Sequence, residues 1–171
     1  GLFWQQSYTL TVSDTSSEGW MVLCDVNGKT RLDMISKVTG KTYLDILKTS
    51  GMPELNHPYS IQYAPNSGHT DSPFYLFTAD GATRLSKNSF VWQKDYDFKY
   101  EVAKQTNMKP QSMVCDQSGM MRMIVSDGYA YSASNMGIQG LFAAVNKQPV
   151  LAPAVGANIG AASYASIYLL Y

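Results

Sequence analysis

Charged side chains are scarce in this 171-residue chain, at 15% of its residues, against about a quarter in ordinary globular domains. Positive and negative charges cancel, and the basic residues form no stripe. Both features exclude the electrostatic signature of a nucleic-acid-binding protein, so we expect no nucleic-acid partner. The shortage is greatest at positions 128–171, where Lys147 is the one charged residue.

Cysteine and histidine are also rare, with two residues each. Cys24 and Cys115 are too far apart for a zinc knuckle or a CxxC redox pair, which leaves either buried thiols or a single disulfide. We favour thiols, because free cysteine is often buried and fits well in an apolar strand. His57 and His69 have no third close ligand, so we predict no metal site and no cofactor.

The last residues of the sequence do not have the uninterrupted apolar pattern of a membrane-spanning helix. The charge-free stretch 148–171 is interrupted by Pro149, Pro153 and Asn158, and no cation flanks its far end. We therefore predict no membrane insertion, and instead a paired strand in the alternating run from Tyr164 onward. Because so apolar a chain end must be covered, we expect positions 128–171 to be buried at a subunit contact.

Alternation of apolar and polar residues is the dominant pattern that is present. It predicts strands at 7–12 and 59–63, and most clearly at 96–102. In that last segment one side is apolar, and the other side is expected to face solvent as in an antiparallel sheet. The polar side consists of Asp97, Lys99 and Glu101.

Helical periodicity is weak along the whole chain, and only 43–47 is expected to form a turn or two of helix. Turn signals recur about every ten residues, as in sandwiches and barrels. We therefore predict an all-β fold, an antiparallel β-sandwich or jelly-roll-like domain with several hairpins and little helix. Residues 1–171 are expected to form a single domain, the C-terminal part of a longer chain, with Trp20 and the Tyr96–Tyr100 face in its core.

One pattern occurs three times, at 23–32, 76–85 and 114–123. Each copy has two apolar residues, a short polar turn that ends in Asn, Asp or Ser before Gly, and an arginine on the return. Such turns between apolar runs predict hairpins. Their glycines are Gly28, Gly81 and Gly119, and their arginines are Arg31, Arg84 and Arg122. Shared turn chemistry is the favoured explanation, and duplication of one unit is the alternative.

Signatures of an enzyme are missing from the sequence. Ser67–Gly68 lacks the flanking glycine of a nucleophile elbow, and neither cysteine has a histidine near it in sequence. The carboxylates lie mostly in turns or on the polar side of a predicted strand, where solvation is the default. We expect no enzymatic activity and assign no catalytic residues.

Two groups of residues are candidates for binding a ligand. The first lies on the longest polar segment, 64–73, and consists of Asn66, His69 and Asp71. The second consists of aromatic side chains that could stack on a sugar or a protein partner, namely Trp92, Tyr129 and Tyr131.

These features together favour a non-enzymatic receptor-binding or attachment head, such as a viral or phage fibre tip, a spike or an adhesin. Its expected partners are a cell-surface glycan or protein and further copies of itself, preferably in a homotrimer. The expected location is extracellular or on a virion surface. The alternatives are a structural shell or pilus-like subunit and a β-sandwich carbohydrate-active enzyme.

Overall fold

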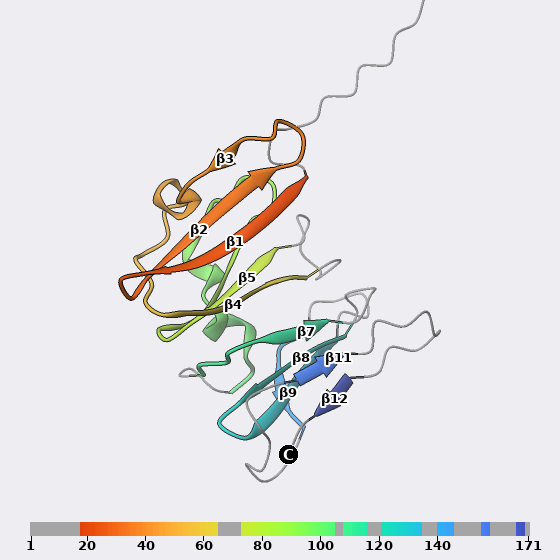
Figure 1. Cartoon of the computed structure of the whole chain (residues 1–171). Coiled ribbons are helices and arrows are strands. Elements are labelled where there is room, and N and C mark those ends of the chain that lie inside the picture. Colours follow the sequence, from red (N-terminus) through yellow and green to blue (C-terminus); the bar gives the residue numbers. More distant parts are fainter. Residues whose placement is uncertain are drawn as a thin grey trace, which may run out of the picture.

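Antiparallel hairpins build a stack of small sheets in the computed structural model of this chain (Figure 1). The structure describes residues 18–64, 73–104, 108–115, 121–134 and 140–145, together with the backbone of 155–157 and 167–169. All pairings between named strands in this part are antiparallel, and the helical content consists of short 3-10 segments. The predicted all-β fold with several hairpins and little helix is confirmed.

The first sheet has the order β1-β2-β3. Its hairpin turns at Asn27 and Gly28, whose φ angles of 54° and 81° both lie in the left-handed region. A two-residue turn of this kind matches the twist of the flanking strands, and Asn-Gly is its preferred sequence. The hairpin predicted at Gly28 is thus confirmed. The strands are β1 (Gly19–Val26), β2 (Lys29–Ser36) and β3 (Thr42–Tyr43).

The middle sheet has the order β4-β5-β6, and its strands follow one another along the chain. Thr78 pairs with Gly81, so the turn between β5 and β6 consists of Ala79 and Asp80. The predicted hairpin is present, and Gly81 is the first residue of its return strand. The strands are β4 (Pro58–Tyr63), β5 (Phe74–Thr78) and β6 (Gly81–Leu85).

The third sheet has the order β10-β9-β8-β7. Cys115 on β7 pairs with Arg122 on β8, which confirms a hairpin across Gly119, although the turn itself lies outside the described residues. Asp127 and Gly128 form a further turn with positive φ between β8 and β9. The strands are β7 (Met113–Cys115), β8 (Met121–Ser126), β9 (Tyr129–Ser134) and β10 (Ala143–Ala144).

Two short strands of the charge-poor tail are described by their backbone. β11 (Val155–Ala157) and β12 (Ile167–Leu169) pair with each other, and β11 lies against β7 and β8 (Figure 1). A strand near the C-terminus is therefore present. Most of the tail lies outside the described residues, so its burial at a subunit contact stays a prediction, as does the strand at 7–12.

The middle sheet is buried on both of its faces. One face contributes Leu76 and Leu85 to a cluster with Leu32 of the first sheet. The other contributes Tyr75 and Phe77 to a cluster with residues of the third sheet. Since side chains alternate along a strand, the two clusters take alternate residues of β5. This explains why 75–78 is a continuous buried run instead of an alternating one.

One local prediction is wrong, and another is met only with a shift along the chain. The segment 96–102 is not a strand but contains two 3-10 turns, η2 (Lys94–Tyr96) and η3 (Phe98–Glu101). The side chain of Asp97 accepts a hydrogen bond from the backbone N–H of Lys99 and so caps η3. The helical turn expected at 43–47 lies slightly later, as η1 (Ile46–Thr49).

The expected core positions also need correction. Trp20 is 61% exposed and Tyr100 is 50% exposed, whereas Phe98 is buried as predicted. Met21 and Leu23 turn toward the middle sheet, and alternation then turns Trp20 to the opposite face of β1. Cys24 and Cys115 form no disulfide, in agreement with the favoured alternative of two thiols, and both are half-buried.

Glu101 lies at the centre of a buried charged cluster between the middle and third sheets. Its Oε1 is 3.0 Å from Arg84 Nε, an ion-pair contact in which the N–H is not aligned for a hydrogen bond. Its Oε2 is 3.3 Å from Arg122 Nη1 and accepts a 2.7 Å hydrogen bond from the hydroxyl of Tyr75. Arg122 Nη1 also donates to the Tyr75 hydroxyl, at 2.9 Å. Two of the three arginines of the recurring pattern therefore share one carboxylate.

Burial dominates the titration of this cluster. It raises the pKa of the Glu101 carboxyl, while the Tyr75 hydroxyl and the two guanidinium groups oppose that rise. Burial, followed by the nearby Glu101 charge, also raises the pKa of Tyr75 well above its usual value. Tyr75 therefore keeps its proton at neutral pH and remains the donor to Glu101.

Replacing Glu101 with Ala should lower the free energy of unfolding by about 3 to 5 kcal/mol, because two buried guanidinium groups lose their counter-charge. The control is Glu18→Ala, since Glu18 forms an exposed 3.0 Å ion pair with Lys37 and its loss should cost about 0.5 kcal/mol or less. Urea denaturation followed by circular dichroism measures both. Equal small losses in the two variants would show that the cluster does not hold the sheets together.

Replacing Gly28 with Ala should lower the free energy of unfolding by about 1 to 2 kcal/mol, because an L-residue is strained at its φ of 81°. The added Cβ would also lie 3.1 Å from Cε1 of His57. Gly40→Ala is the matched control, since Gly40 has a φ of 68° but nothing within 4 Å of an added Cβ. Chemical denaturation should show a loss for Gly28→Ala at least as large as for Gly40→Ala; a smaller one contradicts the turn geometry.

Candidate functional site

A half-open hollow lies where the middle sheet meets the segment that contains η2 and η3. Its volume is about 330 Å³. We call it the Trp92 hollow. Its walls come from four stretches that are distant in sequence, and its lining residues are Met52, Pro53, Leu55, Asp80, Gly81, Ala82, Thr83, Trp92, Asp97, Phe98, Lys99, Met108 and Lys109.

Trp92 is held firmly as one wall of this hollow. Its indole Nε1 donates a 2.8 Å hydrogen bond to Oγ1 of Thr83, and its backbone N–H donates to the carbonyl of Ser50 at 2.7 Å. Thr83 Oγ1 in turn donates to the carbonyl of Tyr96. The side chain of Trp92 also packs against the Leu32–Leu85 cluster. The indole is therefore fixed in place before any ligand arrives, which lowers the entropy cost of binding.

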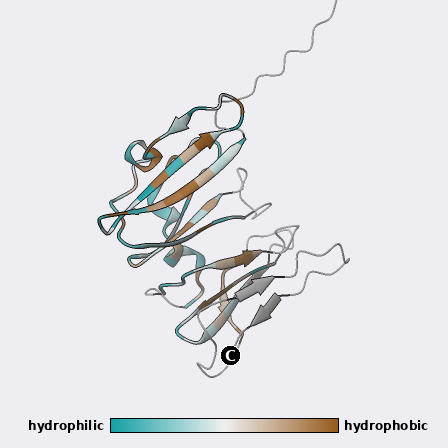
Figure 2. Cartoon of the chain, viewed as in Figure 1, coloured by the Kyte–Doolittle hydropathy of each residue, from teal (hydrophilic) through white to brown (hydrophobic). Residues whose placement is uncertain are grey.

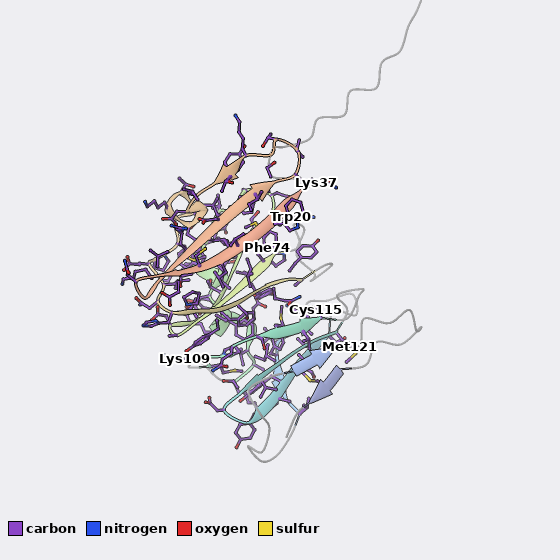
Figure 3. The ribbon with its side chains drawn as sticks, viewed as in Figure 1. Trp20, Lys37, Phe74, Lys109, Cys115 and Met121 are labelled. Atoms are coloured by element: carbon purple, nitrogen blue, oxygen red, sulfur yellow. The ribbon has the colours of Figure 1, made fainter. Side chains whose placement is uncertain are left out.

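Charged groups of both signs line the same hollow. Asp97 Oδ2 is 2.8 Å from Lys99 Nζ, and this hydrogen bond raises the pKa of Lys99. Asp80 Oδ2 accepts hydrogen bonds from the backbone and side-chain amides of Asn56. Lys109 is exposed and forms no ion pair with any residue that the structure describes; it lies at the boundary between the middle and third sheets (Figure 3). The hollow thus offers both acceptors and donors beside an aromatic wall.

The predicted stacking residues do not form one surface. Tyr129 and Tyr131 line a different hollow, of about 480 Å³, and their ring centroids are 6.4 Å apart. Phe142 and Lys104 line this second hollow too, and it shares no lining residue with the Trp92 hollow. Burial raises the pKa of Tyr131. Of the three aromatic candidates, only Trp92 has charged groups of both signs in its hollow.

Asn66, His69 and Asp71 lie outside the described residues, so their role stays a prediction. Sequence reasoning missed Asp80, Asp97, Lys99 and Lys109 as site residues. In the sequence, the Asp80–Gly81 pair predicts only a turn, and the alternation of 96–102 predicts that Asp97 and Lys99 lie on the solvent side of a strand. Their common position beside Trp92 follows from the folding of η2 and η3 onto β6, where Thr83 and Asp97 form an isolated bridge.

Comparison of this chain with protein-family profiles, with curated proteins and with solved structures found no match. Within the described ranges, no helix is long and apolar enough to cross a membrane. The same ranges contain no group of three or more His, Cys, Asp or Glu residues that could hold a metal ion.

Proposed function

We propose that this chain is a non-enzymatic recognition domain that binds a cell-surface glycan through the Trp92 hollow, as part of a receptor-binding or attachment head. The observation that carries the proposal is the fixed indole of Trp92 beside Asp97, Lys99 and Lys109. Sugar rings present C–H faces that stack on an aromatic side chain. Their hydroxyl groups donate to carboxylates and accept from ammonium groups.

The size of the hollow supports a small ligand rather than a protein surface. Ligand pockets span about 300 to 1,000 Å³, and the Trp92 hollow lies at the lower end of that range. It therefore suits a terminal sugar unit of a larger glycan. Binding at one such site is weak, and several copies in an extracellular or virion-surface assembly would multiply it.

The competing functions make different predictions about the ligand. A shell or pilus-like subunit would bind no glycan at this hollow. A carbohydrate-active enzyme would release sugar from a glycan that it binds. Stable binding without turnover is the behaviour expected of a recognition domain.

Replacing Trp92 with Ala should weaken glycan binding about tenfold or more, because the stacking surface is lost; tenfold corresponds to about 1.4 kcal/mol. A glycan array identifies the ligand, and calorimetric titration of the best glycan measures the change. Tyr59→Ala is the control, since Tyr59 is 48% exposed on β4 and lies outside the hollow. Binding should be unchanged in that variant.

Because Trp92 also packs on the core, Lys109→Ala gives a second variant that removes an exposed group from the hollow. It should weaken binding of the same glycan and leave the thermal unfolding temperature unchanged. Full affinity in both variants would place the glycan elsewhere. Sugar release would replace the proposal with the enzyme, and an array with no bound glycan would favour the structural subunit.

A further inference from the structure

A second half-open hollow adjoins the Trp92 hollow. It lies between the start of β2 and the segment that contains η1. Its volume is about 670 Å³, against about 330 Å³ for the Trp92 hollow. We call it the Lys48 hollow, after an exposed lysine in its wall. The two hollows are neighbours, because Met52, Pro53 and Leu55 line both of them.

The ridge between the two hollows, residues 52–55, is held at both of its ends. On one side, the backbone N–H of Trp92 donates a 2.7 Å hydrogen bond to the carbonyl of Ser50, just before the ridge. On the other side, the backbone N–H of Thr30, a wall residue of the Lys48 hollow, donates to the carbonyl of Leu55 at 2.8 Å. The ridge is therefore tied to one wall residue of each hollow, which fixes the two hollows relative to each other.

Polar side chains link the two hollows beside this ridge. Nζ of Lys29, in the wall of the Lys48 hollow, donates a 2.9 Å hydrogen bond to Oδ1 of Asn56. The side-chain amide of Asn56 donates in turn to Oδ2 of Asp80, in the wall of the Trp92 hollow, at 2.8 Å. Pro53, which lines both hollows, is exposed. The hollows thus share a border of hydrogen-bonded polar groups and a ridge residue that is open to solvent.

Two residues in the wall of the Lys48 hollow carry polar atoms without a partner. Thr30 Oγ1 and Arg31 Nε are buried and form no hydrogen bond within the part of the chain that the structure describes. The other buried atoms of this kind all belong to the charged cluster around Glu101. Such atoms are rare in native proteins. Hydrogen-bonding capacity is therefore left over at this wall, which suits a ligand with several hydroxyl groups.

The same wall combines apolar and charged side chains. Leu44 is 67% exposed, and the exposed ammonium group of Lys48 lies 3.6 Å from the carboxylate of Asp45. Hydrophobic and hydrophilic residues alternate along β2 and around η1, which flank this hollow (Figure 2). None of the described residues that line it is aromatic. A sugar unit in this hollow would be bound through its hydroxyl groups and aliphatic contacts, and not by stacking.

We propose that the Trp92 hollow and the Lys48 hollow form one extended site for a linear oligosaccharide. The terminal sugar unit stacks on Trp92, and the following units cross Pro53 into the Lys48 hollow. The ligand class is thus a glycan chain of several units bound from its end inward, and not an isolated monosaccharide. This inference rests on the proposed function, because it extends the same glycan site.

Calorimetric titration of the full chain with two probes tests the extended site. The probes are the best-bound glycan of the array and the free monosaccharide that forms its terminal unit. The longer glycan should bind about tenfold more tightly or better, because its further units gain contacts in the Lys48 hollow. Lys48→Ala should weaken binding of the longer glycan about fivefold, because a charged donor is lost. Binding of the monosaccharide should be unchanged in that variant.

Leu44→Ser is a second variant of the Lys48 hollow, and it should act in the same direction through loss of an exposed apolar contact. Lys41→Ala is the matched control, since Lys41 is exposed next to β3 and lines neither hollow. Both probes should bind that variant as they bind the wild type. Thermal unfolding of each variant shows whether the fold survives, so that weaker binding is not confused with unfolding.

Equal affinities for the longer glycan and the monosaccharide would overturn the extended site. So would full affinity for the longer glycan in both Lys48→Ala and Leu44→Ser, or an equal loss in Lys41→Ala. In each of these cases Trp92→Ala would still weaken binding, and the proposed function would stand. If no glycan binds, or if Trp92→Ala weakens the binding of none, the proposed function fails and the extended site fails with it.

Discussion

The sharing of one carboxylate by two buried arginines is the constraint on which the arrangement of the sheets depends. An isolated buried guanidinium costs several kcal/mol, so the faces of the middle and third sheets that carry Arg84 and Arg122 can be buried only where a counter-charge reaches both. Glu101 fulfils this requirement, and its Oε2 accepts a further hydrogen bond from the Tyr75 hydroxyl. To reach that position, the chain from 94 to 101 must abandon an extended path and turn twice.

The same two turns between 94 and 101 also form part of the candidate site. Once Glu101 is held inside, Asp97 and Lys99 lie against β6 and face the same hollow as Trp92. The indole is fixed by Thr83, a residue of the same strand that carries Arg84. The polar groups of the hollow and the charged cluster of the interior are therefore positioned by one segment. Recognition and stability are therefore coupled through the position of this segment, and also through Trp92, whose side chain both lines the hollow and packs on the core.

The sequence predicts the parts of this molecule that depend on local chemistry. The turn at Asn27–Gly28 forms because its residues tolerate positive φ wherever they occur, and the strand at 59–63 follows its own alternation. The segment 96–102 has an equally regular alternation and still does not become a strand. Whether this segment forms a strand depends on Arg84 and Arg122, which lie far away in sequence. No residue near Glu101 in the sequence distinguishes this glutamate from a solvated surface charge. Trp20 is the opposite case, a side chain expected in the core that is exposed. A large apolar side chain does not by itself indicate which face of β1 packs against the middle sheet.

The order of the sheets in space follows their order in the chain. Strands within each of the three main sheets are consecutive, so no described sheet needs a strand from a distant part of the sequence to be complete. Each sheet can therefore form its backbone ladder before its neighbours are present, and side chains at the junctions are what remains to be assembled. A nick in the backbone between the middle and third sheets would leave every ladder within the three main sheets whole. Two fragments could then reassociate through the Glu101 cluster, the backbone hydrogen bonds that join Glu101 and Ala103 to Phe142, and the apolar residues around them.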